Sequence, residues 1–327
     1  MHDLVAAFPQ QLQKALTIAQ QANLNINSNG IQHVLISGLG GSGIGGSIVK
    51  ELLEPTCSTP ILINKDYFLP GWCNHNSLVI ICSYSGNTEE TVAVMEAALK
   101  KGCRVVAITS GGQVEALAKA HSLPHVIIPG GMPPRSCIGY SLVQLLGIFQ
   151  AAGLTNSNWQ QELVDAQALL VQQQDAIQKE AQALADFLFG RMPVIYSLGS
   201  TEAISVRFRQ QVNENSKVLG WHHVLPEMNH NELVGWAQKN DNLAVVVWRY
   251  AHDYERTLHR LRISKEVFAQ YTPHYREVEV KGASVLAQAL YAVHLGDWCS
   301  CFLADLRGVD AMDISIINHL KDSLSKV

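Results

Sequence analysis

The sequence predicts an α/β fold, with two doubly wound parallel-sheet domains joined by helices. Apolar runs of strand length alternate with segments of helical periodicity, which is typical of βαβ units and parallel sheets. A glycine-rich turn follows the first apolar run, and a strand, glycine turn and helix recur in the second half as a degenerate repeat. We therefore expect a first domain at 1–153, linking helices at 154–190 and a second domain at 191–327.

In the first half, continuous apolar runs predict strands, and apolar residues at a spacing of three or four predict helices. The expected strands cover 33–38, 60–65, 77–83, 104–110 and 125–130, and the expected helices cover 43–53, 88–102, 114–121 and 141–152.

A stretch rich in glutamine and alanine follows at 158–190. Its larger apolar residues recur at helical spacing, which favours one or two amphipathic helices. A disordered linker is the alternative interpretation. The apolar stripe that favours helices includes Leu163, Leu169, Leu170 and Ile177.

The second half restarts with a strand, a glycine-containing turn and a helix, as the first half does. The expected strands cover 192–198, 241–250 and 275–282, and the expected helices cover 200–217, 253–268, 285–306 and 315–324.

Composition excludes several classes of function. The chain of 327 residues is 47% hydrophobic and 16% charged, which is typical of a globular protein with a large core. Its net charge of −4 provides no large basic field, so we expect neither nucleic acid nor a membrane surface as a partner. The N-terminal segment does not read as a secretory signal, and we expect a cytoplasmic protein. Seven scattered cysteines predict reduced core residues.

The glycine turn has the spacing G-x-G-x-x-G at Gly38, Gly40 and Gly43. Such a turn lets backbone N–H groups approach an anion, so it fits a dinucleotide or a smaller phosphorylated ligand. A dinucleotide site typically has an acidic residue at the end of the second strand, which binds the ribose hydroxyls. At that place this chain has Asn64 and Lys65 before Asp66. Asp66 keeps a nicotinamide-dependent oxidoreductase as one alternative.

A second anion-binding signal follows the strand at 77–83. Ser83, Ser85 and Thr88 bring three hydroxyls to the start of the next helix, and Asn87 with Glu90 predicts a capping box there. One hydroxyl is enough to cap a helix, so three favour a phosphate cradle at the carboxyl edge of the sheet. A cradle of this kind fits a sugar monophosphate better than a dinucleotide, with the glycines leaving room for the sugar.

Two sets of motifs in the sequence resemble known families. The pairing of GLGGSGIGG with SYSGNTEET resembles the sugar isomerase (SIS) domain. The segments PPRSCIGYSL, NENSKVLGWHHVLPEMNHNELVGW and HLGDWCSCFLADLRGVD resemble the bifunctional phosphoglucose/phosphomannose isomerase family. The resemblance implies two SIS domains, a homodimer and isomerisation of glucose 6-phosphate and mannose 6-phosphate to fructose 6-phosphate through an enediol, without a metal or other cofactor.

The resemblance also implies roles for individual residues. Glu214 is the expected base, Arg135 faces the reacting carbons, and His230 opens the sugar ring in the active site of the neighbouring subunit. Lys321 is expected near the ring and phosphate end of the substrate. The other expected substrate-binding residues are Gly40, Gly41, Ser42, Ser83, Ser85 and Thr88. Aldose–ketose isomerisation needs a base, a cation near the enediolate and an acid for ring opening, and the chain offers one of each.

Two further alternatives stay open. A zinc site would use His222, His223 and His230 with nearby carboxylates, although their spacing does not match a helical H-x-x-x-H pair. A non-catalytic phosphosugar-binding regulator would need the cradle but neither Glu214 nor His230. The segment GVDAMDISI also departs from the commoner family pattern, and Ser315 is the nearest hydroxyl there.

Overall fold

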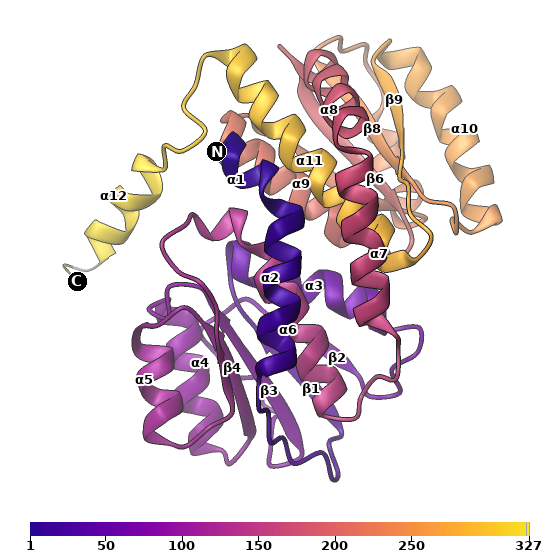
Figure 1. Cartoon of the computed structure of the whole chain (residues 1–327). Helices are drawn as coiled ribbons and strands as arrows, with labels where there is room; N and C mark the ends of the chain where they lie inside the picture. The colour runs from indigo at the N-terminus through magenta and orange to yellow at the C-terminus, as the bar shows by residue number, and fades with distance from the viewer. Residues whose placement is uncertain (325, 327) are drawn as a thin grey trace. The chain divides into compact units, whose positions relative to one another are not determined.

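The computed structural model describes residues 1–324 and 326 (Figure 1). The chain divides into two compact units. The N-terminal unit contains residues 6–172 and 282–290, and the C-terminal unit contains residues 1–5, 173–281 and the chain from Tyr291 onward. Each unit has its own parallel sheet, which confirms the predicted α/β class.

The N-terminal unit is built on a sheet with the strand order β2-β1-β3-β4-β5. Neighbouring strands are parallel, so their carboxyl ends lie along one edge. The strands are β1 (His33–Ser37), β2 (Ile61–Asn64), β3 (Ser77–Ser83), β4 (Arg104–Thr109) and β5 (His125–Ile127). The helices are α2 (Phe8–Gln21), α3 (Gly40–Leu53), α4 (Glu89–Lys100), α5 (Gly112–Ala120), α6 (Ile138–Ala151) and α7 (Trp159–Gln172).

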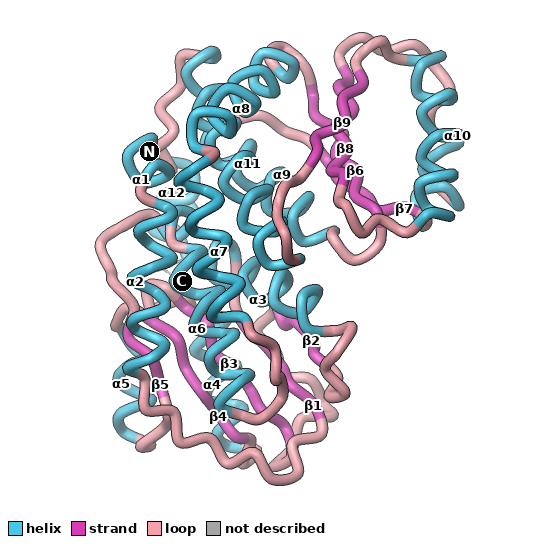
Figure 2. The backbone as a smooth tube through the Cα atoms, turned by 45° about the vertical axis from the view of Figure 1, so that its right-hand side comes forward, coloured by secondary structure: helices cyan, strands magenta, loops and turns pink. Residues whose placement is uncertain are grey.

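Helices cover both faces of this sheet (Figure 2). On one face, Val79 and Ile81 of β3 share a core cluster with Val94 of α4 and Val114 of α5. On the other face, α2 and α3 both pack against α6. As a result β3 is buried along its whole length, which explains its continuous apolar sequence.

The strand order places a topological switch point between β1 and β3. From β1 the chain passes to β2 on one side, and it then returns to β3 on the other side of β1. Open α/β sheets bind ligands outside the carboxyl ends of their strands at such a point. The turns that follow β1 and β3 flank it, and they carry the glycines and the hydroxyls singled out in the sequence.

The C-terminal unit has a second parallel sheet with the order β7-β6-β8-β9. Its strands are β6 (Met192–Leu198), β7 (Trp221–Leu225), β8 (Leu243–Arg249) and β9 (Tyr275–Glu279). Its helices are α8 (Gln174–Leu188), α9 (Glu202–Ser216), α10 (Glu255–Tyr271) and α12 (Ser315–Leu324), with most of α11 (Val285–Arg307) and of α1 (His2–Ala6). Among the described residues, no helix is both long and apolar enough to cross a membrane.

The two faces of the second sheet pack against different helices (Figure 2). On one face, Tyr196 of β6 stacks on Phe268 of α10, with ring centroids 5.3 Å apart. On the other face, Trp248 of β8 forms a T-shaped pair with Phe208 of α9, with ring centroids 5.4 Å apart. α9 and α10 therefore lie on opposite faces of this sheet.

Most predicted elements are confirmed, including both helices of the glutamine-rich stretch, where Leu163, Leu170 and Ile177 are buried. α7 belongs to the N-terminal unit and α8 to the C-terminal unit. The predicted helix at 43–53 begins earlier, at Gly40. All seven cysteines are free, as predicted, and six of them are buried.

The sequence prediction missed β7 and the two N-terminal helices, α1 and α2. β7 has the sequence WHHVL and is a half-exposed edge strand, so it lacks a continuous apolar run. α2 carries the one-sided apolar stripe that is typical of a helix, in which Phe8, Leu12 and Ala15 are buried, so the pattern was present in the sequence and was overlooked.

Two glycines with nearly the same backbone conformation test how tightly the carboxyl edge is packed. Gly86 and Gly102 have φ values of +69° and +70°, but a Cβ on Gly86 would lie 1.7 Å from the carbonyl oxygen of Gly111, whereas one on Gly102 would meet nothing within 4 Å. We expect Gly102→Ala to cost about 1 kcal/mol of unfolding free energy and Gly86→Ala at least about 3 kcal/mol, measured by urea denaturation. Equal losses would show that backbone strain alone decides the cost.

Candidate functional site

The turn after β1 holds its backbone against neighbouring segments. A Cβ on Gly43 would lie 2.2 Å from the carbonyl oxygen of Gly38, and a Cβ on Gly38 would lie 2.8 Å from that of Cys82 in β3. Real Cβ atoms do not approach so closely, so both positions require glycine for packing. These two members of the G-x-G-x-x-G pattern are therefore explained by packing of the chain on itself.

The other glycines of the turn differ from each other. A Cβ on Gly41 would lie 2.8 Å from the carbonyl oxygen of Pro134, so the turn packs directly on the loop that carries Arg135. Gly40 has φ +52°, is exposed and has open space beside it. Because α3 begins at Gly40, the first N–H groups of the helix point out of its N-terminus, where they favour an anion.

Hydroxyl groups from both turns meet beside β3. The Ser83 hydroxyl donates to the Thr88 hydroxyl at 3.1 Å. The Ser42 hydroxyl, in the first turn of α3, accepts a hydrogen bond from the Tyr84 N–H at 3.0 Å. The structure thus brings Ser42, Ser83 and Thr88 together at the switch point, between the N-termini of α3 and α4.

The turn after β3 differs from its predicted form. The predicted capping box of Asn87 with Glu90 is wrong, because α4 begins at Glu89 with Thr88 as its N-cap residue. The Asn87 side-chain oxygen accepts a hydrogen bond from the Gln113 N–H instead, at 3.0 Å. Ser85 is exposed in the same turn, and its hydroxyl accepts from the Asn87 N–H at 3.3 Å.

Tyr84 links the turn to two other loops. Its carbonyl oxygen accepts from the Ser110 hydroxyl at 2.6 Å, and its phenol oxygen accepts from the Met132 N–H at 3.1 Å. Burial is the main cause that raises the pKa of this phenol, which therefore stays neutral. A small hollow of about 10 Å³ lies beside Tyr84, lined also by Gly41, Ser42 and Ser83.

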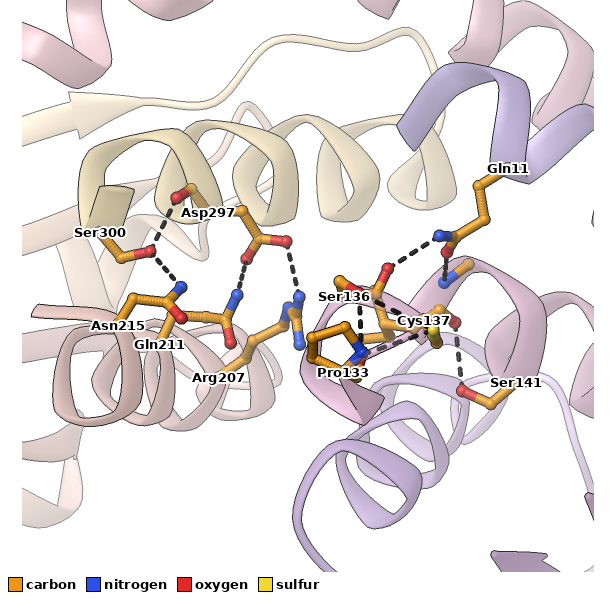
Figure 3. A network of polar contacts seen from close by, with 12 residues as sticks. Gln11, Pro133, Ser136, Cys137, Ser141, Arg207, Gln211, Asn215, Asp297 and Ser300 are labelled. Atoms are coloured by element: carbon orange, nitrogen blue, oxygen red, sulfur yellow. Dashed lines mark hydrogen bonds and ion pairs between the residues drawn. The ribbon is translucent and has the colours of Figure 1, made fainter. Parts of the chain in front are cut away.

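Arg135 lies in a 3₁₀ helix (Pro134–Ser136) and is only 3% exposed. The loop is held by Gln11 of α2, whose side-chain amide donates to the Ser136 carbonyl and accepts from the Gly139 N–H, both at 2.8 Å (Figure 3). The Ser136 hydroxyl also donates to the Pro133 carbonyl at 2.8 Å. Arg135 is thus a buried side chain on a loop whose backbone is held in place, and Gln11 is a supporting residue that the sequence analysis missed.

Asp66, the residue that a dinucleotide site would use, lies exposed just after β2. Its carboxylate accepts a hydrogen bond from the neighbouring Tyr67 N–H at 2.7 Å. The preceding Asn64 side chain donates to the carbonyl groups of Asp66 and Phe68. These contacts shape a local turn and leave the hydroxyls beside β3 as the best anion site of this sheet.

In the C-terminal unit, Glu214 lies partly exposed in the last turn of α9. Side chains one and two turns before it, on the same face of the helix, are buried. Arg207 donates to one carboxylate oxygen of Asp297 at 2.6 Å, and Gln211 donates to the other at 2.8 Å (Figure 3). The Asp297 carboxylate therefore fixes the face of α9 on which Glu214 lies.

A second group of contacts fixes the end of α9. Asn215 donates to the Ser300 hydroxyl at 2.9 Å, and the Ser216 hydroxyl donates to the Ser300 carbonyl at 2.6 Å. After the helix, the Lys217 ammonium donates to the carbonyl oxygens of Glu214 and Asp313. The residues on both sides of Glu214 are therefore attached to α11 and to the chain that leads into α12.

His230 is exposed at the end of a 3₁₀ helix (Glu227–His230) that follows β7. The other histidines of this segment have different partners. His222 lies 3.6 Å from Glu202, and the His223 ring accepts from the Val224 N–H at 2.8 Å. No group of three His, Cys, Asp or Glu side chains in residues 1–324 and 326 is arranged to hold a metal ion.

Lys321 is exposed in α12, the predicted terminal helix. Ser315 begins this helix, and its N–H and hydroxyl donate to the two carboxylate oxygens of Asp313, at 2.9 and 3.3 Å. These hydrogen bonds lower the pKa of Asp313.

The predicted site residues divide between the two units. The glycines and hydroxyls of the two turns belong to the N-terminal unit, together with Arg135. Glu214, His230 and Lys321 belong to the C-terminal unit. The roles of all these residues in a reaction stay predictions.

Comparisons with known proteins agree with this architecture. Residues 177–324 match the model of the bacterial phospho-glucose isomerase C-terminal SIS domain. The chain is 33% identical to a bifunctional phosphoglucose/phosphomannose isomerase of Caldicellulosiruptor bescii, over 100% of this chain and 99% of that protein. It is 34% identical to a protein of the same name from Aquifex aeolicus, over 90% of each chain.

Among solved structures, the chain resembles a putative phosphosugar isomerase of Clostridium difficile 630. The TM-score is 0.76, with 14% sequence identity and coverage of 98% of this chain and 97% of that chain. At this identity the likeness concerns the fold.

Substitutions in the buried ion pair of Arg207 and Asp297 test whether this pair stabilises the packing of α9 on α11. Asp297→Leu removes the carboxylate that faces the buried Arg207 guanidinium, and we expect a loss of about 3–5 kcal/mol of unfolding free energy. Adding Arg207→Met removes the buried positive charge as well, so the double variant should recover at least half of that loss in urea denaturation. A double variant no more stable than Asp297→Leu would assign the loss to packing instead of charge.

Proposed function

Because the chain belongs to the bifunctional phosphoglucose/phosphomannose isomerase family, we propose that it interconverts glucose 6-phosphate and mannose 6-phosphate with fructose 6-phosphate. The observation that carries the proposal is the cluster of Ser42, Ser83 and Thr88 hydroxyls at the switch point, between two helix N-termini. Such a site has many donors and the favourable end of two helix dipoles, which suits the 6-phosphate. Ser85, Gly40 and Gly41 complete the proposed cradle.

The chemistry explains why one site serves both aldoses. Glucose 6-phosphate and mannose 6-phosphate differ only in the configuration at C2, and removal of the C2 proton makes this carbon planar. The two sugars then share one enediolate, which becomes fructose 6-phosphate when a proton is added at C1. One cation therefore serves both substrates, and one base serves both when rotation about the C2–C3 bond turns the C2 hydrogen of either epimer toward it.

We assign the base to Glu214, which takes the proton from C2 and returns it to C1. The Arg135 guanidinium stabilises the negative charge on the enediolate oxygens, since it stays protonated throughout the reaction. Burial of Arg135 and the contacts of Gln11 support this role, because a buried, fixed cation acts more strongly than a solvated one. Lys321 is assigned to the ring and phosphate end of the substrate.

We assign ring opening to His230, which gives a proton to the ring oxygen while the hydroxyl at C1 loses one. In the proposed homodimer, this histidine serves the active site of the neighbouring subunit. The arrangement of the second sheet supports that division. Glu214 is on α9, whereas Asn229, next to His230, bonds to Ser264 of α10 on the opposite face.

An assay of the purified protein tests the function directly. Formation of fructose 6-phosphate is followed from glucose 6-phosphate and, separately, from mannose 6-phosphate, with and without a chelator. We expect turnover of both sugars in both conditions. Binding of the sugars without turnover would support a phosphosugar-binding regulator, and loss of activity with chelator would support a metal site.

Glu214→Gln should keep sugar-phosphate binding but lower kcat by about 10²–10⁴, because the amide is nearly isosteric and cannot accept a proton. Glu202→Gln is the matched control, since it changes an exposed glutamate at the other end of the same helix and should leave kcat within about 3-fold. Both variants are compared by kcat and by the Kd of fructose 6-phosphate. Equal rates for the two variants would refute Glu214 as the base.

The double variant Ser83→Ala with Thr88→Val should raise KM for both aldoses by the same factor, at least about 100-fold, with kcat nearly unchanged. Hydrogen bonds to a charged group contribute about 1.5–3 kcal/mol each, and the phosphate does not react. Because Ser83 and Thr88 are hydrogen-bonded to each other, the double change leaves neither hydroxyl without its partner. Ser77→Ala, at the other end of β3, is the control. A change for only one aldose would contradict a phosphate cradle.

A further inference from the structure

The residues beside His230 are attached to the sheet and to α10, whereas His230 itself is exposed. The Asn229 side-chain amide donates to the Ser264 hydroxyl of α10 at 2.8 Å. The Asn231 side chain accepts from the Glu232 N–H and donates to Glu227. In residues 229–232, the three neighbours of His230 are therefore held by hydrogen bonds, and the His230 side chain is exposed.

The strongest of these anchors is the Glu232 carboxylate. One of its oxygens accepts from the Tyr196 hydroxyl at 2.5 Å and from the Trp221 indole N–H at 3.0 Å. The Tyr196 oxygen in turn accepts from the Trp236 indole N–H at 3.1 Å. One carboxylate therefore joins β6, β7 and the loop that carries His230.

Tyr196 is a rigid attachment point for Glu232. It is fully buried and stacks on Phe268 with an interplanar angle of 9°. Burial is the main cause that raises the pKa of its phenol, followed by the hydrogen bond to Glu232, so the group is protonated and donates at neutral pH.

Packing supplies less support on the outer side of this loop. A pocket of about 490 Å³ opens there, lined by Trp221, Glu232, Trp236 and Lys239 among others. Val234, at the tip of the loop, is 85% exposed. Met228 and Trp236 bury the two ends of the loop in the apolar core, and between them the hydrogen bonds of Glu232 attach the exposed part to the sheet.

From this geometry we propose that Glu232 is a positioning residue for ring opening, which holds the loop so that His230 meets the sugar ring oxygen. The inference rests on the proposed function, in which His230 is the acid. A displacement of about 1 Å in a catalytic group can cost about 100-fold in rate, so loss of the anchor should act on this step.

Exchange between the α and β anomers of glucose 6-phosphate measures the step by itself, because it requires ring opening and closing but no proton transfer at C2. We use the Glu214→Gln protein, in which isomerisation is blocked, and follow anomer exchange by NMR. In this background, Glu232→Ala should lower catalysed exchange at least 10-fold, and Glu232→Gln should retain it within about 3-fold. The glutamine keeps an oxygen that accepts from Tyr196 and Trp221.

Two controls separate the outcomes. Glu227→Ala removes an exposed carboxylate whose hydrogen bond, among the described residues, is to Asn231 of the same loop and not to the sheet. Exchange should stay within about 3-fold of the background protein. Unchanged Kd for fructose 6-phosphate shows that the phosphate site is intact. If His230→Asn abolishes exchange and Glu232→Ala does not, the positioning role is wrong. If His230→Asn has no effect, the proposed role of His230 fails first.

Discussion

Close approach of backbone segments at glycines is the constraint on which the carboxyl edge of the N-terminal sheet depends. At Gly43, Gly41 and Gly86, an added Cβ would lie 2.2, 2.8 and 1.7 Å from a backbone oxygen. Without side chains at these positions, the turns after β1, β3 and β4 and the Arg135 loop pack directly on one another. This packing brings the hydroxyls of two turns together and sets the backbone of the Arg135 loop against the turn after β1. Packing of the backbone is thus enough to explain why glycine is needed at these positions, whether or not a ligand binds.

The C-terminal unit achieves its geometry through side chains. Asp297, in α11, accepts hydrogen bonds from two side chains of α9. Glu232, in the loop after β7, accepts hydrogen bonds from two side chains of the sheet. A buried carboxylate is costly unless its oxygens are satisfied, so the Asp297 arrangement strongly disfavours other rotations of α9. Glu232 is half-buried, and its two hydrogen bonds disfavour other conformations of the loop. Apolar packing specifies position less sharply, because apolar contacts have no directional preference.

Sequence patterns predicted what depends on neighbours in the chain and missed what depends on distant partners. The strands at 33–38 and 77–83 were predictable because they are buried on both faces and read as apolar runs. β7 was missed because it is a half-exposed edge strand. The capping box failed because Asn87 bonds to Gln113 in the next loop, and Gln11 was missed because its partner Ser136 is 125 residues away. Neither contact has a local signature.

On the proposed function, these supporting contacts follow the demands of the reaction. The 6-phosphate keeps its charge and bonds throughout, so the cradle binds substrate and transition state about equally and tolerates small changes of position. The groups at C1, C2 and the ring oxygen act only in the transition state and must be placed to within a fraction of an ångström. Arg135, Glu214 and His230 each lie beside a network of hydrogen bonds, centred on Gln11, Asp297 and Glu232 respectively. On the proposed function, three networks of hydrogen bonds thus support the residues that must be placed most accurately.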